Sequence, residues 1–179
     1  MGKFRDALAL LVAVSLGAGA IYLGLNWDQS SQQDTVADPL SAGALYTTSF
    51  PDLNGNTQAL GQWQGKIIVL NLWATWCAPC REEIPVLIKL QRKYAQHGVI
   101  FVGLALDDNE PVAKYSKEMG IDYPILVAGS AANEFARRLG NRNGLLPFTV
   151  IIDRSGKTVT GHLGGLDETR LEKMLQPLI

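Results

Sequence analysis

The alternation of apolar and polar positions divides the chain into regions of different character. Residues 7–25 form an uncharged, mostly apolar stretch of 19 residues, and Lys3 and Arg5 precede it. Residues 26–43 are rich in Ser, Gln, Asp and Ala and contain one proline. From residue 44 onward, apolar runs alternate with amphipathic stretches, which is typical of a folded domain. We therefore expect three regions, 1–25, 26–43 and 44–179.

The apolar stretch predicts a membrane anchor. A helix over residues 7–25, at about 1.5 Å per residue, would just span a bilayer core roughly 30 Å thick. The basic flank should stay in the cytoplasm, which places the rest of the chain on the periplasmic, extracytoplasmic side. A cleaved signal peptide with Ala18-Gly19-Ala20 as its cleavage site is the alternative. Since signal peptides usually have an apolar core of about 7–15 residues, the uncleaved anchor is favoured, and residues 26–43 then form a flexible linker.

Within residues 44–179 the periodicity predicts alternating strands and helices. The expected strands are the short or continuous apolar runs at 46–50, 58–60, 67–73, 99–106, 125–127, 147–153 and 158–162. The expected helices are the amphipathic stretches at 78–96, 111–119, 131–139 and 167–178. Buried strands that alternate with helices indicate an α/β fold with a central mixed sheet, partly parallel and covered by helices on both faces.

Cys77 and Cys80 are the only cysteines in the chain, and they lie where the predicted strand 67–73 turns into the predicted helix 78–96. A thiol at a helix N-terminus feels the positive end of the helix dipole, which favours the reactive thiolate. Cys77 lies at the edge of the turn and is the predicted nucleophile, while Cys80, one turn into the helix, would resolve a mixed disulfide. A pair of inert structural thiols is the alternative, but a CxxC pair in a βαβ context favours a redox role.

Composition and charge exclude several other classes of function. Hydrophobic residues make up 47% of the chain, enough for a core, and 16 basic against 17 acidic side chains make nucleic-acid binding through phosphate neutralisation unlikely. His97 and His162 are too far apart for zinc-finger spacing, so we expect no metal and no cofactor. A Cys-His hydrolase is disfavoured because Cys80 would quench the nucleophile by oxidation and no orienting partner is evident.

Several segments carry a family resemblance. They are Gly65-Lys66, IIVLNLWATWCAPC at residues 67–80, REEIP at 81–85, YPIL at 123–126 and LPFTVIIDRSGK at 146–157. Over about residues 45 to 178 the chain resembles the membrane-anchored thioredoxin-like proteins of the TlpA/ResA type, including those that serve cytochrome c maturation. The resemblance implies a thioredoxin-like fold and a thiol-disulfide oxidoreductase.

The resemblance also implies where substrate binds. Pro147, preceded by Leu146, matches the family's cis-proline, which lies opposite the CxxC pair and helps to present the substrate backbone. A trans proline that opens a strand is the alternative. Phe148 follows where many relatives have Thr, and it could face either substrate or core. Trp76, next to Cys77, is expected to be a partly exposed contact surface, whereas Trp73 is expected in the core.

Four further residues near the pair have expected roles. Most thioredoxins bury an acid in the strand before the CxxC; the matching residue here is Asn71, which cannot titrate. Glu83 matches a glutamate of ResA-type members and could accept the proton of Cys80. The alternative for Glu83 is an ordinary first-turn carboxylate that complements the helix dipole. Pro85 matches a proline that kinks the helix, and Pro79 lies between the cysteines.

The direction of electron flow follows from the residues between the cysteines. Strong oxidants stabilise their reduced form, and Ala78-Pro79 offers no histidine or charge to do so. Together with the resemblance, this predicts a reductase of disulfides in exported proteins that is itself re-reduced by a membrane electron donor. The alternatives are a peroxiredoxin-like peroxidase, disfavoured because position 74 is Ala where a Thr is expected, and a non-catalytic metal carrier or chaperone on the same fold.

Overall fold

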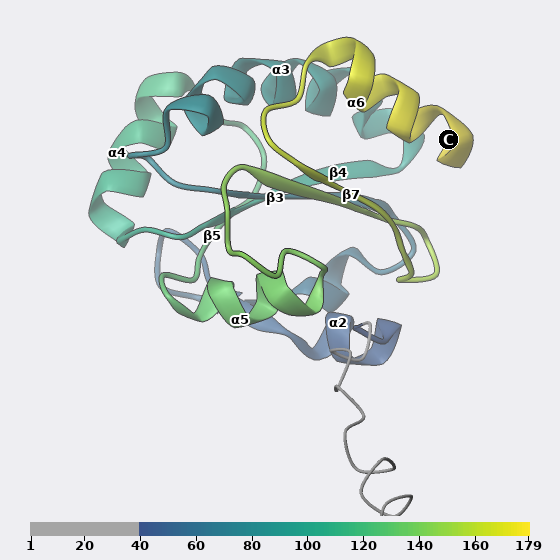
Figure 1. Ribbon diagram of the computed structural model, residues 1–179, viewed down its shortest axis with the longest axis horizontal. Coiled ribbons are helices and arrows are strands. Elements are labelled where there is room, and N and C mark those ends of the chain that lie inside the picture. Colours follow the sequence, from purple (N-terminus) through teal and green to yellow (C-terminus); the bar gives the residue numbers. More distant parts are fainter. Residues whose placement is uncertain (1–39) are drawn as a thin grey trace, which may run out of the picture. The chain divides into compact units, whose positions relative to one another are not determined.

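A five-stranded mixed sheet organises residues 40–179, the part of the chain that the structure, a computed structural model, describes (Figure 1). Its strand order is β5-β4-β3-β6-β7. The strands are β3 Ile67–Trp73, β4 Val99–Ala105, β5 Ile125–Val127, β6 Phe148–Ile152 and β7 Thr158–Leu163. Strands β3, β4 and β5 are parallel, while β6 is antiparallel to both β3 and β7. The predicted mixed sheet is thus confirmed.

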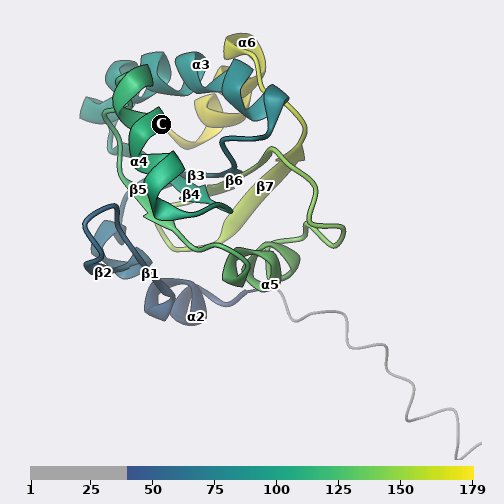
Figure 2. The same ribbon diagram turned by 90° about the vertical axis from the view of Figure 1, so that its left-hand side faces the viewer.

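Helices cover both faces of this sheet. The α-helices are α2 Ala42–Thr47, α3 Ala78–Tyr94, α4 Asn109–Met119, α5 Ala131–Arg138 and α6 Glu168–Leu175. Short 3₁₀ helices are η2 Leu60–Trp63, η3 Ala95–His97 and η4 Gln176–Leu178. Helices α3, α4 and α6 lie on one face, and α2 and α5 lie on the other (Figures 1 and 2).

The alternation of side chains along β3 explains how the two faces are filled. All seven residues of this central strand are buried. Val69 and Trp73 pack in the cluster that contains the apolar residues of α3 and α6, whereas Leu70 and Leu72 pack in the cluster that contains those of α2 and α5. Successive side chains of a strand point to opposite faces. Asn71 therefore points toward the α3 face, into a layer that is mostly apolar.

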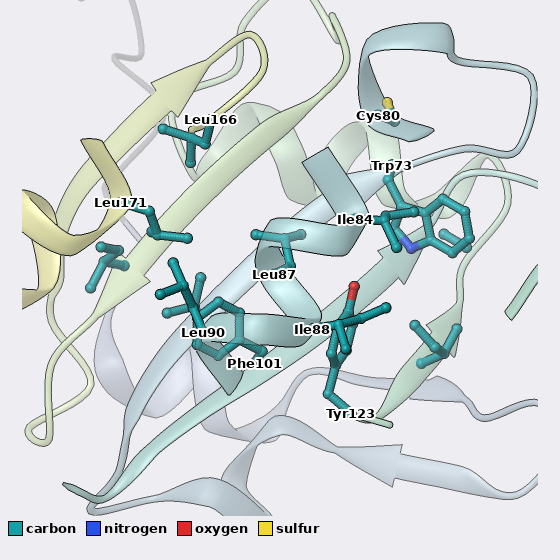
Figure 3. Packing of buried hydrophobic residues seen from close by; sticks show 14 of the residues in the cluster. Trp73, Cys80, Ile84, Leu87, Ile88, Leu90, Phe101, Tyr123, Leu166 and Leu171 are labelled. Atoms are coloured by element: carbon teal, nitrogen blue, oxygen red, sulfur yellow. The ribbon is translucent and has the colours of Figure 1, made fainter. Parts of the chain in front are cut away.

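Helix α3 forms because its apolar positions recur at helical spacing. Ile84, Leu87 and Ile88 are buried and point into the core, in the cluster that also contains Trp73 and Phe101 (Figure 3). The helix contains Pro85 in its interior. It ends at Tyr94, two residues before the predicted end, because the chain tightens into η3 and then turns at Gly98, whose φ of 75° is left-handed.

The structure corrects the sequence-based prediction at the start of the domain. Only the second half of the predicted strand 46–50 is strand: Tyr46 and Thr47 belong to helix α2, whereas Ser49 and Phe50 begin β1. The strands of the small hairpin are β1 Ser49–Pro51 and β2 Thr57–Ala59. The side chain of Ser41 caps α2 by accepting the N–H of Ala44 at 3.3 Å, and Leu40 and Leu45 are buried. The first two residues of α2 therefore lie inside the predicted linker 26–43. Most other predicted bounds agree within three residues.

The predicted membrane helix over residues 7–25 lies outside the described residues. Within residues 40–179, no helix has the length and apolar character needed to cross a bilayer.

Candidate active site

The two cysteines lie at the carboxyl end of the central strand. Strand β3 ends at Trp73, a three-residue turn follows, and α3 begins directly after Cys77. Cys77 and Cys80 form a disulfide, with their Cα atoms 5.3 Å apart. Cys77 is 6% exposed and Cys80 is fully buried. Of the two residues, Cys77 is therefore the more exposed.

The helix start places donors around Cys77. This residue is the N-cap of α3, with extended backbone, and its Sγ accepts the N–H of Cys80 at 3.3 Å. The first N–H groups of a helix have no partner within it, and they stabilise negative charge that is placed there. Pro79 sits in this first turn, where its missing N–H costs no hydrogen bond. When the disulfide opens, the same geometry stabilises a thiolate on Cys77.

An aspartate from the neighbouring strand end holds the turn before Cys77. Asp107 follows β4, and its Oδ2 accepts the backbone N–H of Thr75 at 3.1 Å as well as the Thr75 hydroxyl. Parallel strands β3 and β4 bring their carboxyl ends to the same edge of the sheet, which places the two residues side by side. No local pattern in the sequence predicts this contact of Asp107.

The start of β6 lies at the same edge of the sheet. Phe148 pairs with Leu72 in antiparallel register, so the loop before β6 reaches the level of the CxxC turn. The Leu146–Pro147 peptide bond is cis, as the resemblance implies. Exposed apolar side chains mark this edge: Trp76 is 70% exposed, and Leu145 is 53% exposed.

A buried polar network lies one turn into α3, beneath the disulfide. Glu83 is 3% exposed and accepts two hydrogen bonds, from Asn71 Nδ2 at 2.7 Å and from the N–H of Leu166 at 2.9 Å. Asn71 Nδ2 also donates to Thr149 Oγ1 at 2.9 Å. Asn71 and Thr149 are register partners on β3 and β6, so the sheet itself holds them together.

Burial raises the pKa of Glu83 from its ordinary value of 4.5 to about 7, although the hydrogen bonds from Asn71 and Leu166 act in the opposite direction. Burial also raises the pKa of Tyr123, and the charge of Glu83 adds to that rise. A carboxyl group that titrates near neutral pH next to a redox pair can take up or release a proton during the reaction.

Within residues 40–179, no three His, Cys, Asp or Glu side chains are grouped so that they could hold a metal ion. The geometry at this edge is instead that of a dithiol-disulfide couple, with a nearby acid and an apolar rim.

Comparison with known proteins identifies the family. Residues 36–175 match the model of the Redoxin family. The chain belongs to the Redoxin family. Within it, the chain is 33% identical to the thiol-disulfide oxidoreductase ResA of Bacillus cereus, over 98% of this chain and 95% of the relative. It is 31% identical to the thioredoxin-like protein YneN of Bacillus subtilis, over 71% of this chain and 74% of the relative.

Solved structures give the same fold for this Redoxin-family chain. A thiol:disulfide interchange protein of the thioredoxin family from Chlorobium tepidum is 29% identical, with a TM-score of 0.63 over 73% of this chain and 92% of its own. A secreted thiol-disulfide isomerase from Corynebacterium glutamicum, 21% identical, has a TM-score of 0.69 over 75% of this chain and 84% of its own, which shows the fold. The chain is thus a thioredoxin-like thiol-disulfide oxidoreductase of the ResA type with a CxxC pair.

The structure places the predicted site residues as follows. Trp76 is exposed and Trp73 is buried in the core, as predicted. Glu83 is buried whereas its neighbour Glu82 is exposed, which is unlike an ordinary solvated first-turn carboxylate. Phe148, left open between substrate and core, is 5% exposed and packs in the core cluster on the α2 and α5 face.

Two contacts of the network formed by Asn71 and Glu83 were not predicted. Thr149 is 78 positions from Asn71, and the N–H of Leu166 is 83 positions from Glu83. Only the antiparallel pairing of β6 with β3 could have pointed to Thr149, because it brings the residue after Phe148 opposite Asn71.

Proposed function

We propose that this oxidoreductase works as a reductase of disulfides in exported proteins, including those handled during cytochrome c maturation. In this proposal residues 7–25 form an uncleaved anchor in the cytoplasmic membrane, and the domain lies on the extracytoplasmic side. A membrane protein with a dithiol would return two electrons to the Cys77–Cys80 couple after each turnover. Substrate is thus a protein disulfide.

The neutral dipeptide Ala78-Pro79 is the observation that carries the reductase direction. Strongly oxidising members of this fold stabilise their reduced form, and a low thiolate pKa does so. Neither residue between the cysteines has a charge or a hydrogen-bonding side chain to add to that stabilisation. The couple should therefore favour the disulfide form and give its electrons away.

The reaction runs in two exchange steps. In the first, the Cys77 thiolate attacks one sulfur of the substrate disulfide, forming a mixed disulfide and releasing a substrate thiolate. In the second, Cys80 loses its proton and attacks Cys77 Sγ, which forms the Cys77–Cys80 disulfide and releases the second substrate thiolate. Two electrons pass to the substrate, whose two thiolates take up protons. The greater exposure of Cys77 supports this order of attack.

Glu83 is the proposed acceptor of the Cys80 proton. Residues three positions apart on a helix lie on the same face, with Cβ atoms about 5–6 Å apart. Cys80 is fully buried, so water has little access to its thiol. The raised pKa of Glu83, about 7, leaves a substantial ionised fraction at neutral pH that can take the proton.

The apolar rim supports a polypeptide substrate. Trp76 and Leu145 expose large apolar side chains at the edge of the sheet where Leu146 and Pro147 lie. A shallow groove opens beside the CxxC turn, lined by Ala78, Arg81, Glu82, Tyr115 and Met119. In the proposal the substrate chain lies across this rim, with its disulfide next to Cys77.

Trapping of mixed disulfides tests the proposed function. The Cys80→Ser variant of the full chain, expressed in its native membrane, should accumulate mixed disulfides through Cys77, and mass spectrometry should identify exported proteins as the partners. Cys77→Ser is the matched control and should trap far fewer. Partners that are all cytoplasmic would refute the extracytoplasmic part of the proposal. Equal trapping by both variants would refute Cys77 as the nucleophile.

A further inference from the structure

Of the two polar atoms in the side-chain amide of Asn71, only the nitrogen makes hydrogen bonds. Asn71 is 1% exposed, and its Nδ2 donates to both Glu83 and Thr149. Its Oδ1, also buried, has no hydrogen-bond partner among residues 40–179. Buried polar atoms are nearly always paired, so an unpaired oxygen next to a doubly used nitrogen needs an explanation.

The surroundings of Glu83 suit only one of its two protonation states. Oε1 faces the Nδ2 donor of Asn71, and Oε2 faces the N–H donor of Leu166. An ionised carboxylate accepts both bonds, but a protonated carboxyl group has an O–H that must donate. The backbone N–H of Leu166 cannot become an acceptor. The amide of Asn71 can, because half a turn about its last bond exchanges nitrogen and oxygen.

We propose that Asn71 is a positioning residue whose amide turns over when Glu83 takes up a proton. In the turned state, Oδ1 accepts from the Glu83 carboxyl group and from the Thr149 hydroxyl. In the present state, Nδ2 donates to both. The inference rests on the proposed function, in which the proton comes from Cys80; no other proton is gained or lost. It adds to that function a side-chain amide that can hydrogen-bond to Glu83 in both its ionised and its protonated form.

Three features limit the cost of this turn. Oδ1 gives up no hydrogen bond when it leaves its present place. A hydroxyl both donates and accepts, so Thr149 can follow the amide by rotating its O–H. The turn exchanges two bonds made by the nitrogen for two made by the oxygen, but Nδ2 then occupies the place where Oδ1 had no partner. The turned state is therefore favoured only while Glu83 carries its proton. Pairing between β3 and β6 keeps Asn71 and Thr149 opposite each other throughout.

Few titratable groups face Glu83. Cys80 precedes it on the same face of α3, and Tyr123, from the loop before β5, feels its charge across the core. The remaining contacts, from β3 and from the loop between β7 and α6, are the amide of Asn71 and the N–H of Leu166, which do not titrate. A proton-dependent change in the amide of Asn71 therefore reports Glu83 in the oxidised protein.

Nuclear magnetic resonance of the oxidised full chain in detergent micelles tests the proposal. With ¹³C-labelled Glu and ¹⁵N-labelled Asn, the side-chain amide signals of Asn71 should move with the same pH midpoint as the Glu83 carboxyl carbon. Cross-relaxation from the Asn71 amide protons to the Thr149 methyl group should be strong above that midpoint and weak below it. An Asn71 amide that stays unchanged through the Glu83 midpoint would overturn the proposal.

Variants separate positioning from simple packing. Glu83→Gln, which offers a permanently neutral donor, should hold the Asn71 amide in its turned state at every pH, while Glu82→Gln should behave like the unchanged chain. Asn71→Leu should raise the Glu83 midpoint by about one pH unit, because a bond to a charged group is stronger than a bond to a neutral one. Ser116→Ala, which removes another unpaired buried polar atom, should leave the Glu83 midpoint unchanged.

Each result has a defined meaning even if one variant misfolds. If Asn71→Leu gives no folded spectrum, Thr149→Val takes its place: it should weaken the coupled movement of the amide signals, and Thr149→Ser should restore it. A Glu83 midpoint that neither Asn71→Leu nor Thr149→Val affects overturns the proposal. Because these measurements use the oxidised protein without substrate, a failure of the reductase function would leave them unchanged.

Discussion

Replacing Glu83 by Gln should remove a pH-dependent cost of folding. The ionised carboxylate is buried beneath the CxxC helix, and only two hydrogen bonds offset its loss of water. Gln fills nearly the same volume and carries no charge. We expect the variant to be more stable than the unchanged chain at alkaline pH and to differ less from it in acid.

The magnitude follows from the pKa. A rise of the Glu83 pKa from 4.5 to about 7 on folding corresponds to about 3 kcal/mol. Below pH 4.5 the carboxyl group is protonated in both states, so its full contribution to stability is present. As the pH rises toward 7, the unfolded chain ionises while the folded chain keeps its proton, and stability falls. Above pH 7 the loss is complete.

Urea unfolding of the oxidised protein at several pH values between 4 and 9, followed by tryptophan fluorescence, measures this effect. The slope of stability against pH should be more positive in Glu83→Gln than in the unchanged chain between pH 5 and 7. The matched control is Glu82→Gln, which removes an exposed carboxylate from the same helix and should keep the original slope. Equal slopes for Glu83→Gln and the unchanged chain would refute the burial of an acid with a raised pKa.

Two other outcomes are expected. Stopped-flow mixing measures the rate at which Cys80 resolves a mixed disulfide on Cys77, and this rate should rise with pH around a midpoint near 7. Glu83→Gln should lower the rate about 100-fold and remove the midpoint. An unchanged pH profile in this variant would argue against Glu83 as the proton acceptor. In the same unfolding assay, Gly156→Ala should be more destabilising than Gly55→Ala by about 1–3 kcal/mol. Both glycines have positive φ, but of the two only Gly156 would place a Cβ 2.7 Å from another side chain, the ring of Tyr46. Equal losses of stability would show that this ring moves away freely.

The central layers of the fold could be predicted because their patterns are continuous. The strand 67–73 is apolar at every position but one, and α3 repeats apolar residues at helical spacing over four turns. The helix at the start of the domain could not be predicted in this way. Tyr46 and Thr47 are aromatic and β-branched types that favour strands, yet they belong to a six-residue helix that Ser41 caps and Leu45 anchors in the core. Such short helices depend on tertiary packing rather than on local propensity.

In the candidate site, too, some features could be predicted from the sequence and others could not. The cysteine pair and its place at a helix start could be predicted from spacing alone, and Glu83 could be placed on the face of Cys80. The hydrogen-bond partners of Glu83, however, are Asn71 and Leu166, which lie 12 and 83 positions away in the sequence. No local pattern shows that Asp107 holds the turn before Cys77 or that Thr149 reaches Asn71, because both contacts depend on strand pairing. The depth of Glu83 in the core likewise follows only from the packing of α3 against the sheet.

The reduction potential of the Cys77–Cys80 couple tests the central claim most directly. The full chain in detergent micelles, equilibrated with glutathione or dithiothreitol buffers and then alkylated, gives the potential from the fraction of free thiol. A reductase with a neutral dipeptide between its cysteines should have a potential close to that of thioredoxin, about −270 mV. A potential close to that of the strong oxidant DsbA, about −120 mV, would contradict the account.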